Sequence, residues 1–358
     1  MAFSEEKAVE DLTEIYRKSF EKQTKKIINA KVKGLDIEDT RIAADVNRIL
    51  KSLEEKNKQW AGKVVPKIYG RTREEIMGFY KKHNIKLDED ISFRKIHQNA
   101  VVELQKNLYD ELNNGIIQIG RKTKDRLKEI TEETTKIQMA GGSERAEAIK
   151  EASEKIANEG LQYITYANGA KVNITKYVEM ATKTTSSAAI NRATVNQQLQ
   201  YKQDLIKISF HSTSCPICAP FQDRIYSLKT ENTEYPHISQ INEGAFVNYG
   251  TIHPNCRHRA LPYILTLDDN KEQNKKESNK PFADNRSEFG KERYEKRQKV
   301  NRINRKIDKL GMQRDIAVVA GEKDLVRDID EKINRLENET EEIRQWEIDG
   351  LQTNQLFE

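Results

Sequence analysis

The sequence lacks several features that mark familiar classes of protein. It has only three cysteines, all between Cys215 and Cys256. A disulfide scaffold usually has an even number of cysteines spread along the chain. No apolar run approaches the ~20 residues that a membrane helix needs, and the opening residues MAFSEEKAVEDL contain no apolar signal-peptide core. We therefore expect a protein made in a reducing cytoplasm, without disulfides or a membrane segment.

Apolar residues are scarce as well. Hydrophobic residues make up 36% of the chain and charged residues 33%, which is less apolar and more charged than is usual for a globular protein. Long solvated helices around a small core fit this composition better than one large core. The net charge is only +5, so bulk charge alone gives no reason to expect nucleic-acid binding.

The first 159 residues follow a helical pattern. Apolar residues recur there at steps of three and four, over 9–20, 42–53, 76–80 and 93–112. We expect Gly115 and Gly120 to interrupt the last of these helices, and Gly141-Gly142 to end a polar helix that follows it. The region is predicted to form a helical arm or bundle.

The pattern changes near residue 160. Two β-rich runs around Asn168-Gly169 predict a hairpin, and a helix over 176–205 and a short strand LIKISF follow. We interpret 160–265 as a compact α+β domain, 266–284 as an exposed polar linker, and 285–350 as an antiparallel helical hairpin that turns near Gly321. The predicted fold class is therefore α+β, mostly α.

The residues suited to chemistry lie within 211–263. Cys215 and Cys218 form a C-x-x-C pair, and Cys256 and His258 form a second pair far downstream. Zinc prefers four tetrahedral ligands of sulfur and imidazole type, and a two-residue spacer lets two thiolates of one turn reach one ion. A second pair from a remote loop would complete the shell and stabilise a segment poor in apolar residues. This spacing predicts a structural zinc site with these four ligands.

Two other interpretations of this segment stay open. A lone C-x-x-C pair is common, so the cysteines could be reduced thiols in a tight turn, with Cys256 a small buried residue. Within the metal interpretation, His211 or His253 could replace His258 as a ligand, or could hydrogen-bond a ligand from outside the shell.

Nucleophilic catalysis is the third possibility. Cys215 or Cys218 could pair with His211 or His253 as thiol and imidazole. Cysteines crowded with histidines favour ligation over a lone nucleophile, and the phosphate-loop, H-E-x-x-H and G-x-S-x-G motifs are absent. We therefore expect no enzymatic activity. The remaining histidines are expected on the surface, namely His83, His97 and His237.

Several stretches resemble the phage minor capsid protein 2 family, which is related to the head-morphogenesis proteins typified by protein F of phage Mu. The stretches occur in the family's order: TKYVEMATKTTSSAAINRA, IKISFHSTSCPICAPFQDRIYSL, YGTIHPNCRHRALPY, and a charged tail from YEKRQKVNRINRKIDKL to EEIRQWEIDGLQ. The resemblance covers roughly 160–350 and is weaker over the first 150 residues, where only the helical character matches.

The resemblance implies a set of signature positions: His211, Cys215, Cys218, His253, Cys256 and the residue at 258. Relatives have Cys or His at 258, an exchange that a metal ligand tolerates, so the resemblance supports His258 as the fourth ligand. This chain departs from the family at Asp223-Arg224, where a glycine is usual. The departure puts the geometry of that turn in question.

The resemblance also implies a function. Members are minor virion proteins that associate with the portal and other head proteins, and that act in head assembly and genome packaging or delivery. We therefore expect a structural protein of the phage head, present in the host cytoplasm during assembly. The alternative is a zinc module that contacts or processes packaged double-stranded DNA, with Arg224, Arg257 and Arg259 meeting phosphates.

Overall fold

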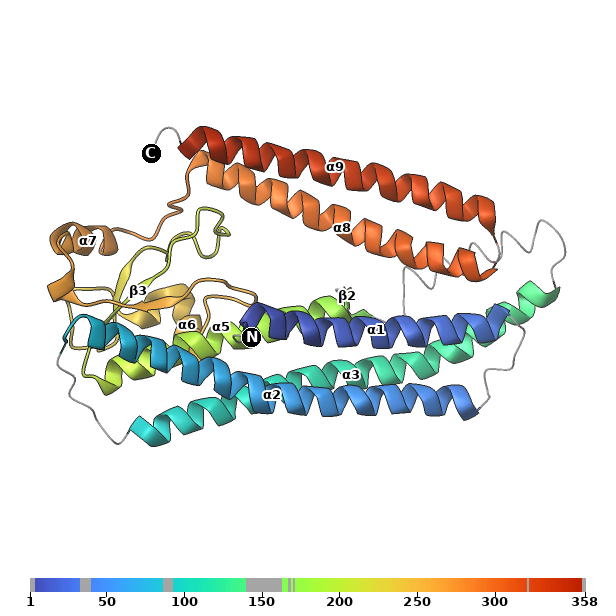
Figure 1. The fold of residues 1–358 in the computed structure, drawn as a ribbon, viewed down its shortest axis with the longest axis horizontal. Helices are drawn as coiled ribbons and strands as arrows, with labels where there is room; N and C mark the ends of the chain where they lie inside the picture. Colours follow the sequence, from blue (N-terminus) through green and yellow to red (C-terminus); the bar gives the residue numbers. More distant parts are fainter. Residues whose placement is uncertain are drawn as a thin grey trace. The chain divides into compact units, whose positions relative to one another are not determined.

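The structure is a computed structural model that describes residues 4–32, 40–85, 93–139, 163–166, 169, 171–320 and 322–355 (Figure 1). Its elements in chain order are α1 (Glu5–Val32), α2 (Thr40–Lys82), α3 (Phe93–Met139), β1 (Tyr163–Thr165), β2 (Lys171–Asn173), α5 (Ile174–Gln200), β3 (Leu205–Ile208), β4 (Ile225–Ser227), η1 (Ile238–Gly244), α6 (Ala245–Tyr249), β5 (Ala260–Pro262), η2 (Leu265–Leu267), α7 (Lys271–Ser278), α8 (Glu288–Ala320) and α9 (Lys323–Gln355). Long helices dominate and the sheets are small, so the predicted fold class is confirmed. The expected features at Gly141-Gly142, Asn168 and Gly321 lie outside the described residues.

The chain divides into two compact units. Unit 1 consists of Met1–Thr13, Glu55–Asn113 and Val178–Gly290, and unit 2 of Glu14–Glu54, Asn114–Tyr177 and Lys291–Glu358. Each of α1, α2, α3 and α5 contributes residues to both units. The boundaries at 160, 266 and 285 remain a prediction about which parts of the chain fold independently.

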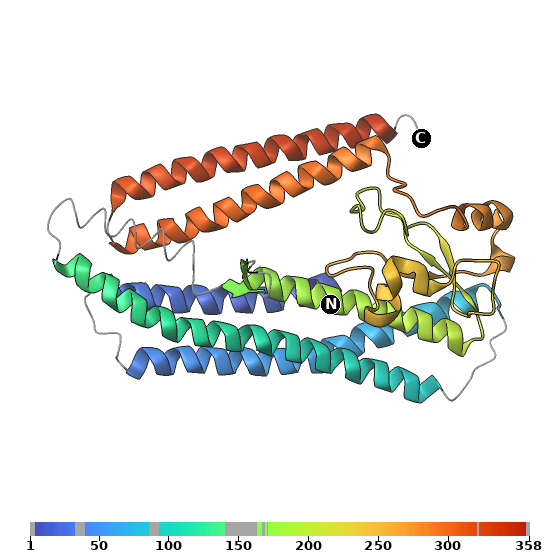
Figure 2. The ribbon, with the colours of Figure 1, turned by 180° about the vertical axis from the view of Figure 1, so that it is seen from behind.

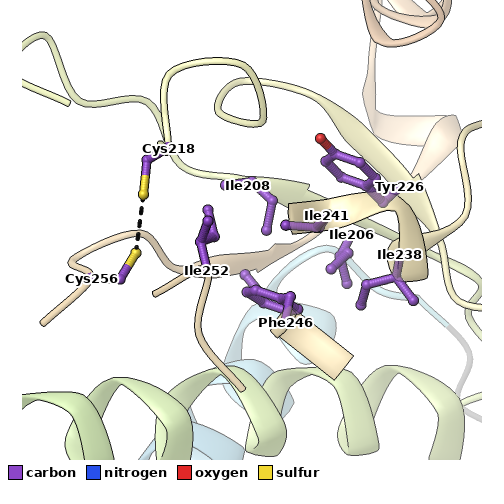
Figure 3. Packing of buried hydrophobic residues seen from close by; sticks show 10 residues of the cluster. Ile206, Ile208, Cys218, Tyr226, Ile238, Ile241, Phe246, Ile252 and Cys256 are labelled. Carbon is purple, nitrogen blue, oxygen red and sulfur yellow. Dashed lines mark hydrogen bonds between the residues drawn. The ribbon is translucent and has the colours of Figure 1, made fainter. Parts of the chain in front are cut away.

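Unit 1 contains an antiparallel sheet with the strand order β4-β3-β5. Its central strand has the sequence LIKI, and the isoleucines favour the extended backbone. Strand β3 pairs Ile206 with Tyr226 of β4 and with Pro262 of β5. Buried side chains from the sheet, η1, α6 and two loops form the core drawn in Figure 3: Ile206, Ile208, Cys218, Tyr226, Ile238, Ile241, Phe246, Ile252, Cys256 and Ala260.

A buried polar network joins α5 to α2 and α3 within unit 1. The ring of His97 lies between the Tyr69 hydroxyl, 2.9 Å from Nδ1, and the Gln200 side-chain oxygen, 3.0 Å from Nε2. Asn196 donates to the same hydroxyl, and Gln198 receives a hydrogen bond from Tyr80. His97 is only 4% exposed, so the expectation that it lies on the surface was wrong. Both of its ring nitrogens are hydrogen-bonded to residues far away in the sequence, which a local sequence pattern cannot predict.

The segment expected to be an exposed linker, 266–284, is folded against the sheet. It contains α7, and the buried Ser278 hydroxyl accepts a hydrogen bond from the backbone N–H of Ile225 in β4. The Arg224 guanidinium donates to the carbonyl oxygens of Ser278, Lys280 and Pro281. A buried arginine thus satisfies the backbone of a sequence whose polarity had suggested free solvent exposure.

Unit 2 contains the expected β-hairpin, in which β1 and β2 pair antiparallel with Ile164 opposite Val172. The expectation that Gly115 and Gly120 break the helix was wrong, because α3 runs through both. An added Cβ at Gly115 would lie 3.0 Å from the Ile164 side chain, and one at Gly120 would lie 2.9 Å from that of Leu50. Both glycines serve close side-chain packing against the helix.

The C-terminal helices of unit 2, α8 and α9, lie side by side as an antiparallel hairpin in both views (Figures 1 and 2). The seam buries apolar residues at helical spacing, including Ile303, Ile329 and Ile343. Ion pairs of opposite charge span the two helices. Glu347 receives bonds from Arg293 and Arg297 at 2.5 and 2.6 Å, and Lys299 contacts Glu339 at 2.7 Å.

The turn before β4 keeps the geometry that a glycine would favour. Asp223, at the point where the chain departs from the family pattern, has φ +59°, in the left-handed region. Aspartate tolerates this region better than most residues with a side chain. Its N–H donates to the Ile208 carbonyl, and its carboxylate contacts Lys207 at 2.7 Å.

We expect the backbone conformation at residue 223 to decide which substitutions are tolerated. Asp223→Val should lower the free energy of unfolding by about 1–2 kcal/mol, because a β-branched residue is strained at positive φ. Asp223→Gly and Asp223→Asn should each stay within about 1 kcal/mol of the parent, since both residues accept this conformation and the exposed ion pair contributes little. Chemical denaturation of the three variants measures this, and equal losses in the Val and Asn variants would contradict it.

A second prediction concerns the pH dependence of the α8–α9 hairpin. Burial tends to raise the pKa of Glu347, but hydrogen bonds and charges from Arg297 and Arg293 outweigh it, so the pKa lies below its usual value. A depressed carboxyl pKa stabilises the fold above the unfolded pKa, and the stabilisation disappears as the pH falls through the folded pKa. Glu347→Gln should therefore cost ~1–2 kcal/mol at pH 7, and the cost should shrink as the pH falls below the usual carboxyl range.

Thermal unfolding followed by helical circular dichroism, at a series of pH values, checks this dependence. Glu341→Gln is the matched control, because Glu341 is 69% exposed and, within the described chain, pairs with Arg344 of its own helix. A loss in Glu347→Gln that does not change between pH 7 and pH 3 would show that packing, and not charge, stabilises this position.

Candidate metal centre

The C-x-x-C pair sits in a tight turn at the edge of the unit 1 core. The backbone N–H groups of Cys218 and Ala219 both donate to the Cys215 carbonyl, at 3.1 and 3.0 Å. Cys218 is buried among the core residues, whereas Cys215 is half-buried. The turn therefore presents one sulfur toward the interior and one near the surface.

The second half of the site is a loop that polar side chains of α5 hold by its backbone. Thr184 accepts from the Asn255 N–H, and Ser187 donates to the Cys256 carbonyl. Asn191 donates to the carbonyls of residues 250 and 258 and accepts from the N–H of residue 260. These three side chains are spaced at i, i+3 and i+7 and so share one face of the helix. They fix the loop that carries Cys256 and His258.

Gly250 allows this loop to approach α5 closely. Its φ is +74°, and an added Cβ would lie 3.1 Å from both the Cα and the Cβ of Ala188. Only glycine meets both conditions without displacement of the helix or the loop. This contact with α5 lies at the start of the loop that carries Cys256 and His258.

The structure brings the sulfur and imidazole groups together in two sets that share Cys218. One set is Cys215, Cys218 and His253, and the other is Cys218, Cys256 and His258. Within each set the candidate ligand atoms lie within 4.8 Å of one another. The Cys218 and Cys256 sulfurs point toward each other at 3.6 Å (Figure 3). Of the four predicted ligands, Cys215 therefore belongs to a different set from Cys256 and His258.

The two histidines differ in what their ring nitrogens face. Gln222 fixes His258. The bond from the His211 N–H, 2.9 Å long, identifies the atom of Gln222 that faces both residues as its side-chain oxygen. An oxygen can only accept, so His258 Nε2, 3.0 Å away, must donate to it. This leaves the Nδ1 lone pair of His258 directed at Cys256, 3.5 Å away. His253 Nδ1 donates to the Pro254 carbonyl, and its Nε2 lies 3.1 Å from the Cys215 sulfur.

Hydrogen bonding within the cluster shifts the acidity of its members. Bonds from Cys218, and then from His253, lower the pKa of Cys215 to about 3 despite burial. A hydrogen bond from Cys218 is the largest of the causes that lower the pKa of Cys256 to about 4, while the pKa of Cys218 is raised. The bond to Cys215 raises the pKa of His253 to about 9. Two sulfurs are thus favoured as thiolates, the form that binds metals.

His211 lies beside these sets and belongs to neither. Its ring packs edge-on against the His258 ring at 4.7 Å, and its Nε2 is 3.1 Å from the Ser209 hydroxyl. Sequence reasoning missed Gln222, which is fully buried and orients His258. It also missed the face formed by Thr184, Ser187 and Asn191. Small polar residues at helical spacing are the signal that could have revealed this face.

The arrangement suits metal binding better than the other chemistries considered. Cysteine and histidine groups are positioned to bind a metal, and both histidines have an outer nitrogen held by an oxygen acceptor, as metal-ligating histidines usually do. A thiol–imidazole pair is also present at Cys215 and His253. Within the described residues, no third side chain orients His253 as a catalytic base is usually oriented.

Comparison with known proteins places the chain in a family. The model of phage minor capsid protein 2 matches residues 13–352, which is nearly the whole chain. None of the curated proteins matches the chain, and neither does any solved structure. Among the helices that the structure describes, none has the length and apolar character of a membrane span. The match over both units shows that the chain belongs to the phage minor capsid protein 2 family.

Proposed function

We propose that this protein is a non-enzymatic component of a tailed-phage head that associates with the portal and acts in head assembly and in genome packaging or delivery. Membership of a minor capsid family supports a structural role in the head and is the observation that carries the proposal. Other head proteins are the partner class that the family suggests. We add to this partner class an association with the portal, a part in genome packaging, and presence in the host cytoplasm during assembly.

The physical character of the chain agrees with docking. The long helices α8 and α9 have apolar seams and charged outer faces, which are suited to contacts over a wide surface. In unit 1, a small core is completed by a polar loop that α5 and the cysteine cluster fasten.

We propose further that one zinc ion fastens this loop, bound by Cys215, Cys218, Cys256 and His258. Three thiolates and one imidazole complete a tetrahedral shell. Gln222 fixes His258 with its lone pair toward the sulfurs, whereas His253 is a donor to the Cys215 thiolate. In this scheme His253 stabilises the charge of a ligand, and His211 supports the His258 ring. The metal would supply folding free energy and no reaction step.

The alternative, a DNA-contacting zinc module, depended on three arginines, and two of them already bond other groups of the protein. Arg224 is 7% exposed and bonds backbone carbonyls. Arg259 pairs with Glu5 at 3.1 Å. Only Arg257 is exposed. We therefore assign no nucleic-acid contact to the neighbourhood of the cysteines.

Elemental analysis of freshly purified protein tests the metal. We expect close to one zinc per chain in the parent protein. Gln222→Leu should weaken zinc affinity about 10–100-fold, because residues that orient a ligand typically contribute that much. His258→Gln should lose the metal, and His253→Gln, as the matched control, should retain it. Metal-free parent protein would contradict the site, and the opposite behaviour of the two histidine variants would make His253 the ligand.

The assembly role is tested by co-purification with the portal from lysates in which heads assemble. We expect the parent protein to co-purify, and Cys215→Ser, Cys218→Ser and Cys256→Ser to fail in proportion to their loss of thermal stability. A serine hydroxyl is a poor zinc ligand, so each variant loses one of the four bonds that stabilise the loop.

Two results would contradict this account. A thermally stable but inactive Cys215→Ser, with active Cys218→Ser and Cys256→Ser, would indicate a nucleophile paired with His253. Absence of the parent protein from both portal complexes and finished heads would remove the proposed association, whatever its zinc content.

A further inference from the structure

The charged contacts across the α8–α9 hairpin join residues of opposite charge, except in one stretch where charges of the same sign gather. Lys299 contacts Glu339 and Arg314 contacts Asp330, so opposite charges face each other at two levels. These contacts set the antiparallel register of the stretch between them. At the levels between them, cations of both helices border one hollow.

The hollow has a volume of about 440 Å³, and its lining is Lys306, Lys309, Leu310, Gln313, Lys332, Arg335 and Leu336. All four cations are exposed, and the leucines that form the floor are half-buried. Like charges around one hollow repel one another, so the arrangement weakens the hairpin unless an anion lies between them.

No Asp or Glu is among the described residues that line this hollow. Within the described parts of the chain, no ion pair joins Lys306, Lys309 or Lys332 to a carboxylate, and Arg335 has only an exposed contact with Glu331 at 3.9 Å. The sequence of α8 contains ten Lys or Arg residues and five Asp or Glu, and that of α9 contains five and ten. Acidic residues are therefore plentiful in α9, but none of them lines the hollow that these lysines border. Violations of a local rule that is otherwise obeyed tend to mark functional positions.

We propose that this cationic hollow binds the phosphate backbone of a double-stranded nucleic acid. Lysine presents a point charge without directional preference, which suits contacts to phosphates that carry no sequence information. The described residues of the lining include no aromatic side chain on which unpaired bases could stack, so a duplex fits better than a single strand. The floor offers two leucines, too few to anchor an acidic amphipathic helix, which uses apolar contacts over successive turns.

This inference is independent of the portal association and of the zinc site. Its test is duplex DNA binding by the full-length protein over a range of salt concentrations. The test variant replaces Lys306, Lys309, Lys332 and Arg335 by Gln. Each phosphate contact adds about 0.9 to the slope of log affinity against log salt, so the slope should fall by about 3–4 and low-salt affinity by about tenfold or more.

The control variant removes four exposed cations of the same two helices that lie outside the hollow: Arg305→Gln, Lys323→Gln, Arg327→Gln and Arg344→Gln. It has the same net charge as the test variant and should keep most of the slope. The test variant should also unfold at a higher temperature than the parent in the absence of DNA, because repulsion across the hollow has been removed.

Three results would overturn the proposal. The parent protein could fail to bind duplex DNA even at about 50 mM salt, where contacts to phosphates are strongest. The two quadruple variants could lose affinity equally, which would reduce the effect to net charge. Polyglutamate could compete as effectively as duplex DNA at equal charge, which would identify an acidic protein as the occupant.

Discussion

The folding of unit 1 depends on satisfying the polar side chains that α5 buries. One face of this helix uses Thr184, Ser187 and Asn191 to hold the backbone of the Cys256 loop. Further along, Gln198 and Gln200 meet tyrosine and histidine partners from α2 and α3. A buried amide without a partner costs ~1–3 kcal/mol, so these contacts must form together. In a chain with little apolar material, hydrogen bonds give α5 the specific placement that a larger core would provide elsewhere.

Periodicity predicted the part of the fold that depends on local sequence. Steps of three and four residues correctly indicated long helices, the α8–α9 hairpin and its seam at Ile303, and alternation indicated β3. The same reasoning failed where distant residues decide. Gly115 and Gly120 appeared to be helix breakers, but they make room for Ile164 and Leu50. His97 appeared to be a surface residue, but Tyr69 and Gln200 bury it.

The candidate site shows a similar boundary between local and distant information. Spacing identified Cys215, Cys218, Cys256 and His258 because a C-x-x-C turn and a downstream C-x-H pair have few chemical uses. Spacing could not show that Cys218 is shared by two sets, or that His253 approaches Cys215. It also gave no reason to single out Gln222. The orientation of a ring nitrogen is a three-dimensional property and leaves no trace in residue order.

The bonds from Asn191 have a consequence for how such a sequence can change over time. Its side chain bonds only backbone groups of the loop, at Gly250, His258 and Ala260. Backbone atoms are the same for every residue, so these bonds do not depend on which side chains occupy the exposed positions between them. An insertion or deletion between 250 and 260 would move at least one of the three groups out of reach. Mutation is therefore free to alter the chemistry of exposed loop positions such as Arg257, while the number of residues in the loop must stay fixed.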